Sequence, residues 1–294
     1  MIKASSIVEG KENQGSIDLA VEAAKQCVAS GGIEMEDIGV LINLGMYRED
    51  NIAEPAMVTL IQKKFRLNYD PIRKSPADKT TFCFDLLNGS CGFLNAVQIV
   101  DALTKNGRIK YALVVSSDVH PSLEQVSEFP YTHCSAAVIL AQSSQEGKGF
   151  KKIILRTSKN NDYPGVYGYL DLGDAGTEGR KSVVINIDEN YSSRLQEFAV
   201  TSIKEYIDSE NIDLSDVKLI ISEPAKNFGK QVAKSIGHDE GLVVEIFEEF
   251  RDSHSSALSI GYHLAANNTL KEGDKILFVG ATSGLTTACG LYIV

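Results

Sequence analysis

The chain has 294 residues, of which 43% are hydrophobic and 23% charged, so it is long enough to bury one large core or two coupled ones. With 29 Lys and Arg against 39 Asp and Glu, the formal charge of −10 excludes phosphate-backbone binding as the main role, although a local basic patch could serve an acidic partner. No apolar run of about 18 residues occurs, nor a basic start followed by an apolar stretch. We therefore expect a cytoplasmic protein with neither a membrane span nor a secretory signal.

The cysteines are odd in number and form no CxxC pair, which favours reduced thiols over disulfides or a structural zinc. They are Cys27, Cys83, Cys91, Cys134 and Cys289. No metal site is expected, because His120, His238 and His263 have no partner at ligand spacing.

The first half of the chain alternates apolar stretches typical of strands with stretches of helical periodicity. A helix is predicted over 16–30, where Ser16 can cap the start and Gly31-Gly32 can end it. The other predicted elements are a strand at 38–44, a helix at 53–63, a strand at 81–87, a helix at 91–104 and a strand at 111–116. Continuous Val, Ile and Leu strands are typical of a parallel sheet covered by helices on both faces, so the fold class is α/β.

Residues 142–181 are rich in Ser, Gly, Asn and Asp, which predicts a long irregular connection before the pattern restarts. The elements predicted after it are a strand at 182–187, a helix at 190–207, a strand at 217–222, helices at 226–236 and 255–266, and strands at 275–280 and 286–294. Because the two parts share element order, we expect a duplicated architecture with halves at 1–160 and 161–294.

Cys91 is the first candidate for chemistry, because it follows a predicted strand and an Asn88-Gly89 turn and directly precedes an apolar-periodic helix. A thiol at the start of a helix lies near the positive end of the helix dipole, which lowers its pKa and favours the nucleophilic thiolate. The alternative is a small buried cysteine in a strand-to-helix turn, since free cysteines usually behave as small hydrophobic residues.

The segment around this cysteine, DLLNGSCGFLNAVQIVDAL at 85–103, resembles the nucleophile region of the thiolase fold, and specifically that of the ketoacyl synthase III group. The resemblance covers most of the chain, including SIDLAVEAAKQCVASGGIEMEDIGVLI, SEPAKNFGKQVAKSIG, RDSHSSALSIGYHLA and DKILFVGATSGLTTACGLYIV. It implies a duplicated five-layer α-β-α-β-α fold and a homodimer. As activity it implies acyl-thioester transfer through an acyl-cysteine, with acyl-CoA or acyl carrier protein as substrate and no permanently bound cofactor.

Several positions depart from the family pattern. Ser222 stands where the family has a histidine, His254 where it has an asparagine, and His133 where it has an acidic residue. Compared with the family, we expect the opening segment, a strand plus residues that help to hold coenzyme A, to be missing or trimmed. Without the resemblance, His254 in DSHSS would be a capping group and Ser222 a hydrogen-bonded strand terminus.

The register at the nucleophile is open. Alignment from Asn88 places Cys91 on the family nucleophile, whereas alignment from Gly92-Phe93 places Ser90 there. Cys91 is favoured, because a thiol needs less activation than a hydroxyl.

Within the resemblance, Cys91 attacks the thioester, and backbone N–H groups at Cys91 and near Ser283-Gly284 stabilise the oxyanion. His254 is the general base, and Ser222 assists it. Because a hydroxyl and one imidazole hold a malonyl-derived enolate less well than the family's pair, acyl transfer to a hydroxyl or amine competes with decarboxylative condensation as the second step.

Lys226, Lys230 and Lys234 recur every four residues on one predicted helix. Such a stripe is usually a solvated face. Within the resemblance, this helix borders the active-site entrance and the lysines would form the docking surface for an acidic acyl carrier protein.

Two other functions remain open. The substituted catalytic set also fits a catalytically impaired synthase-like subunit that pairs with an active homologue. A Ser-His-Asp hydrolase built on Ser222 or Ser90 is disfavoured, because no G-x-S-x-G motif occurs in the chain.

Overall fold

The structure is a computed structural model and describes residues 1–69, 79–105, 107, 109–124, 126–143, 145–159, 165–170, 176–268 and 270–294. Its first sheet has the strand order β1-β5-β4-β2-β3. The bounds are β1 Ile2–Glu9, β2 Ile38–Asn43, β3 Phe82–Asp85, β4 Tyr111–Asp118 and β5 Cys134–Ala141. Strand β2 is parallel to β3 and β4, as the continuous apolar runs predict, and β5 is antiparallel to β4 and β1.

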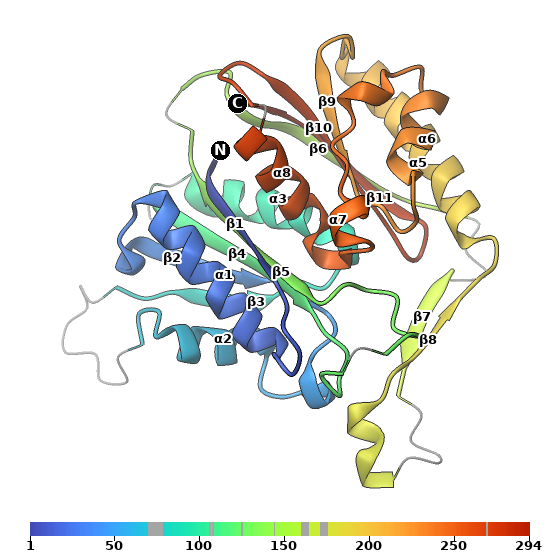
Figure 1. The fold of residues 1–294 in the computed structure, drawn as a ribbon. Helices are drawn as coiled ribbons and strands as arrows, with labels where there is room; N and C mark the ends of the chain where they lie inside the picture. The colour runs from blue at the N-terminus through green and yellow to red at the C-terminus, as the bar shows by residue number, and fades with distance from the viewer. Residues whose placement is uncertain are drawn as a thin grey trace.

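Helices cover both faces of this sheet (Figure 1). On the outer face lie α1 Ser16–Gly31 and α2 Met57–Phe65, whose side chains share a buried cluster with the sheet that includes Leu19, Ile61 and Leu113. On the inner face lie α3 Gly92–Thr104 and α8 Ala257–Asn268.

The second sheet has the order β6-β11-β10-β9 and packs on the other side of α3 and α8 (Figure 1). Its strands are β6 Gly149–Thr157, β9 Val217–Ile221, β10 Lys275–Thr282 and β11 Thr286–Ile293. One apolar cluster joins Val114 of the first sheet, Phe93 of α3 and Phe278 of the second sheet, so the two helices form a central layer between the sheets.

Helices α5 Tyr191–Glu210 and α6 Phe228–Ser235 cover the outer face of the second sheet (Figure 1). Their buried cluster includes Leu195, Val232 and Val279. The layers therefore follow one another as α1/α2, first sheet, α3/α8, second sheet and α5/α6. This arrangement confirms the predicted α-β-α-β-α architecture.

The region 142–181 differs from its predicted irregular structure. It contains β6 and β7 Val166–Tyr169. The predicted strand at 182–187 becomes β8 Val184–Ile187, which pairs with β7 in a two-stranded arm and not with the second sheet. Since β6 already belongs to the second sheet, the chain changes sheets between β5 and β6, ahead of the predicted division at residue 160.

Short helices complete the described part of the chain. They are η1 Met35–Asp37, η2 Glu49–Asn51, η3 Gly89–Cys91, η4 Gly176–Lys181, η5 Glu240–Leu242, α7 Phe247–Phe250 and η6 His254–Ser256. Two of them matter for function: η3 starts α3, η6 starts α8, and these two turns contact each other between the sheets.

Candidate active site

A cavity of about 290 Å³ opens where the two halves of the molecule meet. It is lined by the turn η3, the segment before β5, the start of α5, the turn η6 and the end of β10; its polar lining includes Ser90, Tyr131, Asp252, His254 and Ser283. We refer to it as the His254 cavity. It collects residues separated by more than 100 positions in the sequence, as expected for a site between the ends of duplicated sheets.

Glycines at two positions allow η3 to approach β10 closely. Gly89 has φ +45°, and a Cβ atom there would lie 2.2 Å from Thr282 Oγ1. A Cβ atom at Gly280 would lie 2.7 Å from the carbonyl oxygen of Ser90. Both distances are far too short for a side chain, so glycine is required for this turn. The turn decides which of the next two side chains faces the cavity.

Ser90 is the residue of this turn that lines the His254 cavity. Its side chain is buried, and Oγ donates a hydrogen bond to the carbonyl oxygen of His254 at 3.0 Å. The structure thus places the hydroxyl at the site, in the register that alignment from Gly92-Phe93 gives.

Cys91 points away from the cavity. Its thiol is fully buried between α3 and the second sheet, where Sγ lies 3.4 Å from the carbonyl oxygen of Gly280 and 3.7 Å from that of Thr286. Burial raises the pKa of Cys91, and the nearby Cys289 raises it further, which is the opposite of the direction predicted from the helix dipole. The backbone N–H of Cys91 donates to the carbonyl oxygen of Asn88 at 3.0 Å and so already has a partner. In this structure Cys91 is not among the residues that line the His254 cavity.

His254 faces the cavity and is held by a carboxylate. Its Nδ1 lies 3.1 Å from Oδ2 of Asp118, the last residue of β4, and both side chains are buried. Asp118 also accepts hydrogen bonds from the hydroxyl of Ser255 at 2.5 Å and from the backbone N–H groups of Met46 and Tyr47 at 2.8 and 2.9 Å. This network fixes the carboxylate, which in turn directs the proton of the imidazole to Nδ1 and leaves Nε2 as an acceptor.

The charges of this pair stabilise each other. Burial lowers the pKa of His254, but the charge and hydrogen bond of Asp118, together with the charge of Asp252, outweigh burial and raise the pKa overall. Burial likewise raises the pKa of Asp118, but the charge of His254 and the hydrogen bonds of His254 and Ser255 lower it overall. The structure therefore holds an ionised carboxylate against an imidazole that titrates above its ordinary range.

Aromatic rings fix the plane of the imidazole. The ring of Tyr131 stacks on His254 with the centroids 4.2 Å apart, and Tyr47 lies 5.6 Å away on a tilted plane. Tyr47 and Tyr131 also stack on each other at 5.0 Å. Neither tyrosine nor Asp118 was predicted as a site residue. Asp118 had a signal in the sequence, because it is a polar residue two positions after the buried strand predicted at 111–116.

Ser222 does not reach the cavity. Its hydroxyl donates to the carbonyl oxygen of Ala281 and accepts from the N–H of the same residue, both at 2.9 Å. It thereby joins the ends of β9 and β10. This is the hydrogen-bonded strand terminus that the sequence analysis gave as the alternative to a catalytic role. Ser283 lines the His254 cavity, and Gly284 follows it with φ +71° in the turn between β10 and β11.

The three lysines do not form a free stripe on one helix. Lys226 precedes α6 and lies 3.0 Å from Glu248, and Lys230 lies 2.5 Å from Glu245. Lys234 is exposed in the last turn of α6. None of the three lines the His254 cavity.

No group of three or more His, Cys, Asp or Glu in the described residues could hold a metal ion, and His133 instead contacts the carbonyl oxygen of Gln14 through Nε2 at 2.6 Å. Within the described ranges, no helix has the length and hydrophobicity needed to cross a membrane.

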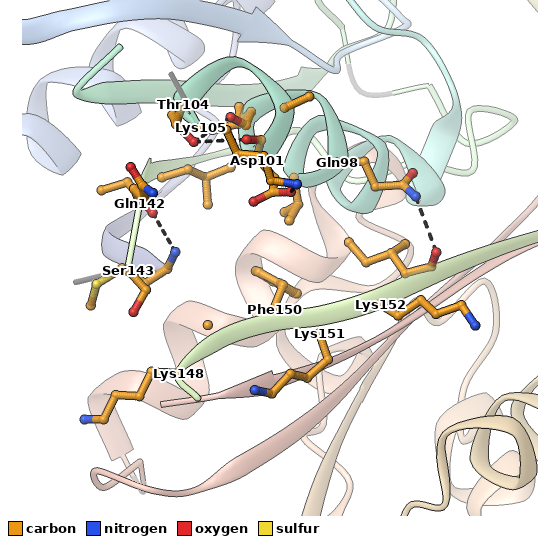
Figure 2. A pocket seen from close by; sticks show the side chains of 18 residues that line it. Gln98, Asp101, Thr104, Lys105, Gln142, Ser143, Lys148, Phe150, Lys151 and Lys152 are labelled. Carbon is orange, nitrogen blue, oxygen red and sulfur yellow. Dashed lines mark hydrogen bonds and ion pairs between the residues drawn. The ribbon is translucent and has the colours of Figure 1, made fainter. Parts of the chain in front are cut away.

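A larger cavity of about 620 Å³ lies at the other end of α3 (Figure 2). Lysines line it, but Lys105, Lys148 and Lys152 form ion pairs with Asp101, Glu272 and Glu210. Figure 2 shows Gln98 of α3 reaching β6, where it donates to the carbonyl oxygen of Ile153 at 3.4 Å. No histidine or cysteine is among the described residues that line this cavity.

Solved structures and curated sequences similar to this chain identify its class. FabH, the 3-oxoacyl-(acyl carrier protein) synthase III of Xanthomonas oryzae, superimposes with a TM-score of 0.79 over 100% of this chain and 98% of its own, at 16% identity. Cerulenin-bound OleA of Xanthomonas campestris gives 0.79 over 97% and 83% of the two chains, at 19% identity. The protein therefore has the thiolase fold.

The sequence comparisons are more specific. The β-ketoacyl-[acyl-carrier-protein] synthase III of Clostridium perfringens is 25% identical over 293 residues, covering 95% of this chain and 85% of its own. That of Wolbachia pipientis is 23% identical over 281 residues, covering 94% and 83%. No protein-family model matches the chain. The predicted resemblance to ketoacyl synthase III is confirmed.

Proposed function

We propose that the protein transfers acyl groups from thioesters, with Ser90 as nucleophile, His254 as general base and Asp118 as the residue that positions His254. The observation that carries the proposal is the Asp118–His254 pair, whose imidazole faces the cavity that Ser90 also lines. Nucleophile, base and positioning carboxylate are the three parts that covalent acyl transfer needs.

In the first half-reaction, His254 Nε2 takes the proton of the Ser90 hydroxyl while Oγ attacks the thioester carbonyl carbon. A C–O bond forms, the C–S bond breaks, and the leaving thiolate receives the proton from His254. The Ser90 hydroxyl must first leave the carbonyl oxygen of His254, to which it donates in this structure. Backbone N–H groups of Ser90 and Ser283 are the proposed donors to the oxyanion.

In the second half-reaction, a hydroxyl or amine is the proposed acceptor. It loses its proton to His254, attacks the acyl carbon, and Ser90 Oγ departs with that proton. Decarboxylative condensation needs two donors on the enolate oxygen, and Ser222 already bonds to Ala281 in both directions. This supports acyl transfer over condensation.

For the acyl donor, we propose acyl-CoA or an acyl carrier protein. The curated relatives carry the carrier protein in their names. Docking of the carrier at Lys226, Lys230 and Lys234 is retained as part of this proposal, although ion pairs with Glu248 and Glu245 partly neutralise two of the lysines.

We propose a homodimer formed through β3. It is an edge strand of the first sheet and therefore has backbone N–H and C=O groups that a second strand can pair with. Phe82 on this strand is 61% exposed, and Leu87 just after it is also exposed. A second copy of the chain would cover these side chains by continuing the sheet.

Intact mass measurement after incubation with a panel of acyl-CoAs and acyl carrier proteins tests the function. We expect a mass gain of one acyl group that Ser90→Ala abolishes. No mass gain with any donor would contradict the proposal and favour the impaired synthase-like subunit. Rapid loss of the adduct without an acceptor would instead favour a hydrolase.

A further inference from the structure

The charged side chains of the His254 cavity are unbalanced. Asp188, Glu189 and Asp252 line it, and among the described residues no lysine or arginine does. His254 is the one titratable base on its wall.

The three carboxylates are not equally free. Asp188 accepts from the N–H of Asn190 at 2.9 Å and lies 3.6 Å from Arg194, which reduces its charge at the cavity. Asp252 accepts one hydrogen bond, from the backbone N–H of His254 at 3.0 Å, and no described cation pairs with it. Glu189 is exposed at the rim, and no contact ties its carboxylate to a described residue. Asp252 and Glu189 are thus the lining carboxylates that form no ion pair with a described lysine or arginine, and His254 is the base nearest to Asp252.

His254 supplies an independent sign that a ligand belongs here. The residue is 7% exposed, its Nδ1 is taken by Asp118, and no described residue bonds to Nε2. His254 lines the cavity, so the proton of an incoming hydroxyl or amine can bond to Nε2 there. The rings of Tyr131 and Tyr191 also line the cavity, and aromatic rings attract cations.

We infer that the acyl acceptor is a small molecule that carries a positive charge beside its hydroxyl or amine, and that Asp252 and Glu189 select it over neutral and anionic acceptors. This inference rests on the proposed acyl transfer and adds the substrate class of its second step. It also predicts that a malonyl carboxylate is a poor ligand here, because like charges repel at close range.

Acceptors that differ only in charge test the inference. The acylated enzyme is mixed at pH 8 with choline, with the neutral isostere 3,3-dimethylbutanol, or with anionic 3-hydroxypropanoate, and loss of the acyl adduct is followed by intact mass. Burial raises the pKa of Asp252 to about 6, so its carboxylate is ionised at this pH. We expect choline to react about tenfold or more faster than the neutral alcohol, as one uncompensated charge nearby suffices for that factor. The anion should not exceed the rate with water.

Two variants connect the preference to the named carboxylates. Asp252→Asn keeps an oxygen for the N–H of His254, and Glu189→Gln changes an exposed side chain that folding does not need. Each should reduce the choline preference several-fold. Asp208→Asn removes the same charge from the exposed surface of α5 and should leave the preference unchanged. Equal rates for choline and its isostere, or an unchanged preference in both variants, would overturn the inference.

A binding measurement separates this inference from the proposed function. Calorimetric titration of Ser90→Ala with choline and with 3,3-dimethylbutanol needs no acyl enzyme. One outcome is that no donor acylates the wild type, while Ser90→Ala binds choline more tightly than 3,3-dimethylbutanol and Ser90→Ala/Glu189→Gln binds choline more weakly than Ser90→Ala. In that case the proposed transfer reaction is wrong and the proposed cation site is supported. If acylation occurs but neither binding nor turnover distinguishes the two compounds, the cation site fails and the transfer reaction stands.

Discussion

The side chains at positions 90 and 91 have different chemical environments although they are neighbours in η3. The hydroxyl of Ser90 faces the His254 cavity, and the thiol of Cys91 lies against the carbonyl oxygens of Gly280 and Thr286. Nucleophilicity follows from access and ionisation, so the more reactive functional group in solution is here the less available one.

We predict that the acyl group attaches to Ser90. Peptide mapping of the acylated protein should find the label at this residue, and Ser90→Ala should abolish it while Cys91→Ala retains it. The adduct should resist neutral hydroxylamine, because it is an oxygen ester and not a thioester. A label that survives Ser90→Ala and disappears in Cys91→Ala would restore the cysteine assignment.

The Asp118–His254 pair predicts a specific pH dependence. His254 must be neutral to accept a proton, so activity falls as pH decreases through its raised pKa. In Asp118→Asn this carboxylate charge is gone, and only the smaller effect of the Asp252 charge still opposes burial, so the pKa of His254 falls. The acid limb of the pH–rate profile should therefore shift to lower pH, while the maximal rate falls by about 100-fold because the imidazole loses its orientation.

Ser255→Ala is the matched control for this shift. It removes one hydrogen bond to Asp118 but leaves the carboxylate beside His254. Its acid limb should stay much closer to that of the wild type. Identical acid limbs for Asp118→Asn and the wild type would exclude Asp118 from positioning the base.

At the scale of elements, the edges of the two sheets are not equivalent. Strand β3 closes one side of the first sheet and β6 one side of the second, and both expose an apolar side chain. Phe82 on β3 is 61% exposed and Leu155 on β6 is 37% exposed. Only β3 leads directly into η3, so an interface there would support the turn that carries Ser90.

We predict that Phe82→Lys converts a dimer into a monomer, because a charge buried without a partner at an interface costs several kcal/mol, about enough to prevent association at micromolar concentration. Leu155→Lys adds the same charge to the edge strand of the other sheet and should leave the dimer intact. Sedimentation velocity measures both. A wild-type monomer, or dissociation by Leu155→Lys alone, would contradict the assignment of β3.

At the scale of the whole molecule, the sequence predicts the layers better than the site. Continuous apolar runs identify β2, β4, β9 and β10, because strands buried on both faces need little else. Strand β1 was not predicted since its Lys and Ser residues interrupt the run, and β6 was not predicted since the adjacent Lys151 and Lys152 and then Arg156 leave only a short apolar run. Strand β1 pairs with β5, and β6 pairs with β11. Local patterns of apolar residues cannot predict such pairing between distant strands.

The site depends on contacts of still longer range. His254 could be named from the resemblance, but its partner Asp118 lies 136 residues earlier in the chain. The choice between Ser90 and Cys91 depends on one residue of register. In this structure Ser90 is the one that lines the cavity, next to the close approach of Gly89 to Thr282. Neither the approach of β10 nor a positive φ can be derived from the alternation of apolar and polar residues.

The net charge of −10 limits how a carrier protein can approach as acyl donor. An acidic carrier is repelled by the molecule as a whole, so productive encounter requires a local cationic surface. Lys226, Lys230 and Lys234 are the proposed surface, and Glu248 and Glu245 weaken it. Removing the lysines and removing their partners should therefore have opposite effects.

We predict that the triple Lys→Glu variant lowers kcat/KM for a carrier-bound acyl donor by about tenfold, while Glu245→Gln/Glu248→Gln raises it, because screened surface charges act mainly on encounter. The same acyl group on CoA is the control donor and should be affected much less. The carrier reaction should also slow as salt is increased, since exposed charges are screened over about 8 to 10 Å at physiological ionic strength. Equal losses with both donors would indicate damaged folding. If neither variant changed the rate with the carrier-bound donor, the lysines would be an ordinary solvated surface, and their ion pairs would only link α6 to its neighbouring segment.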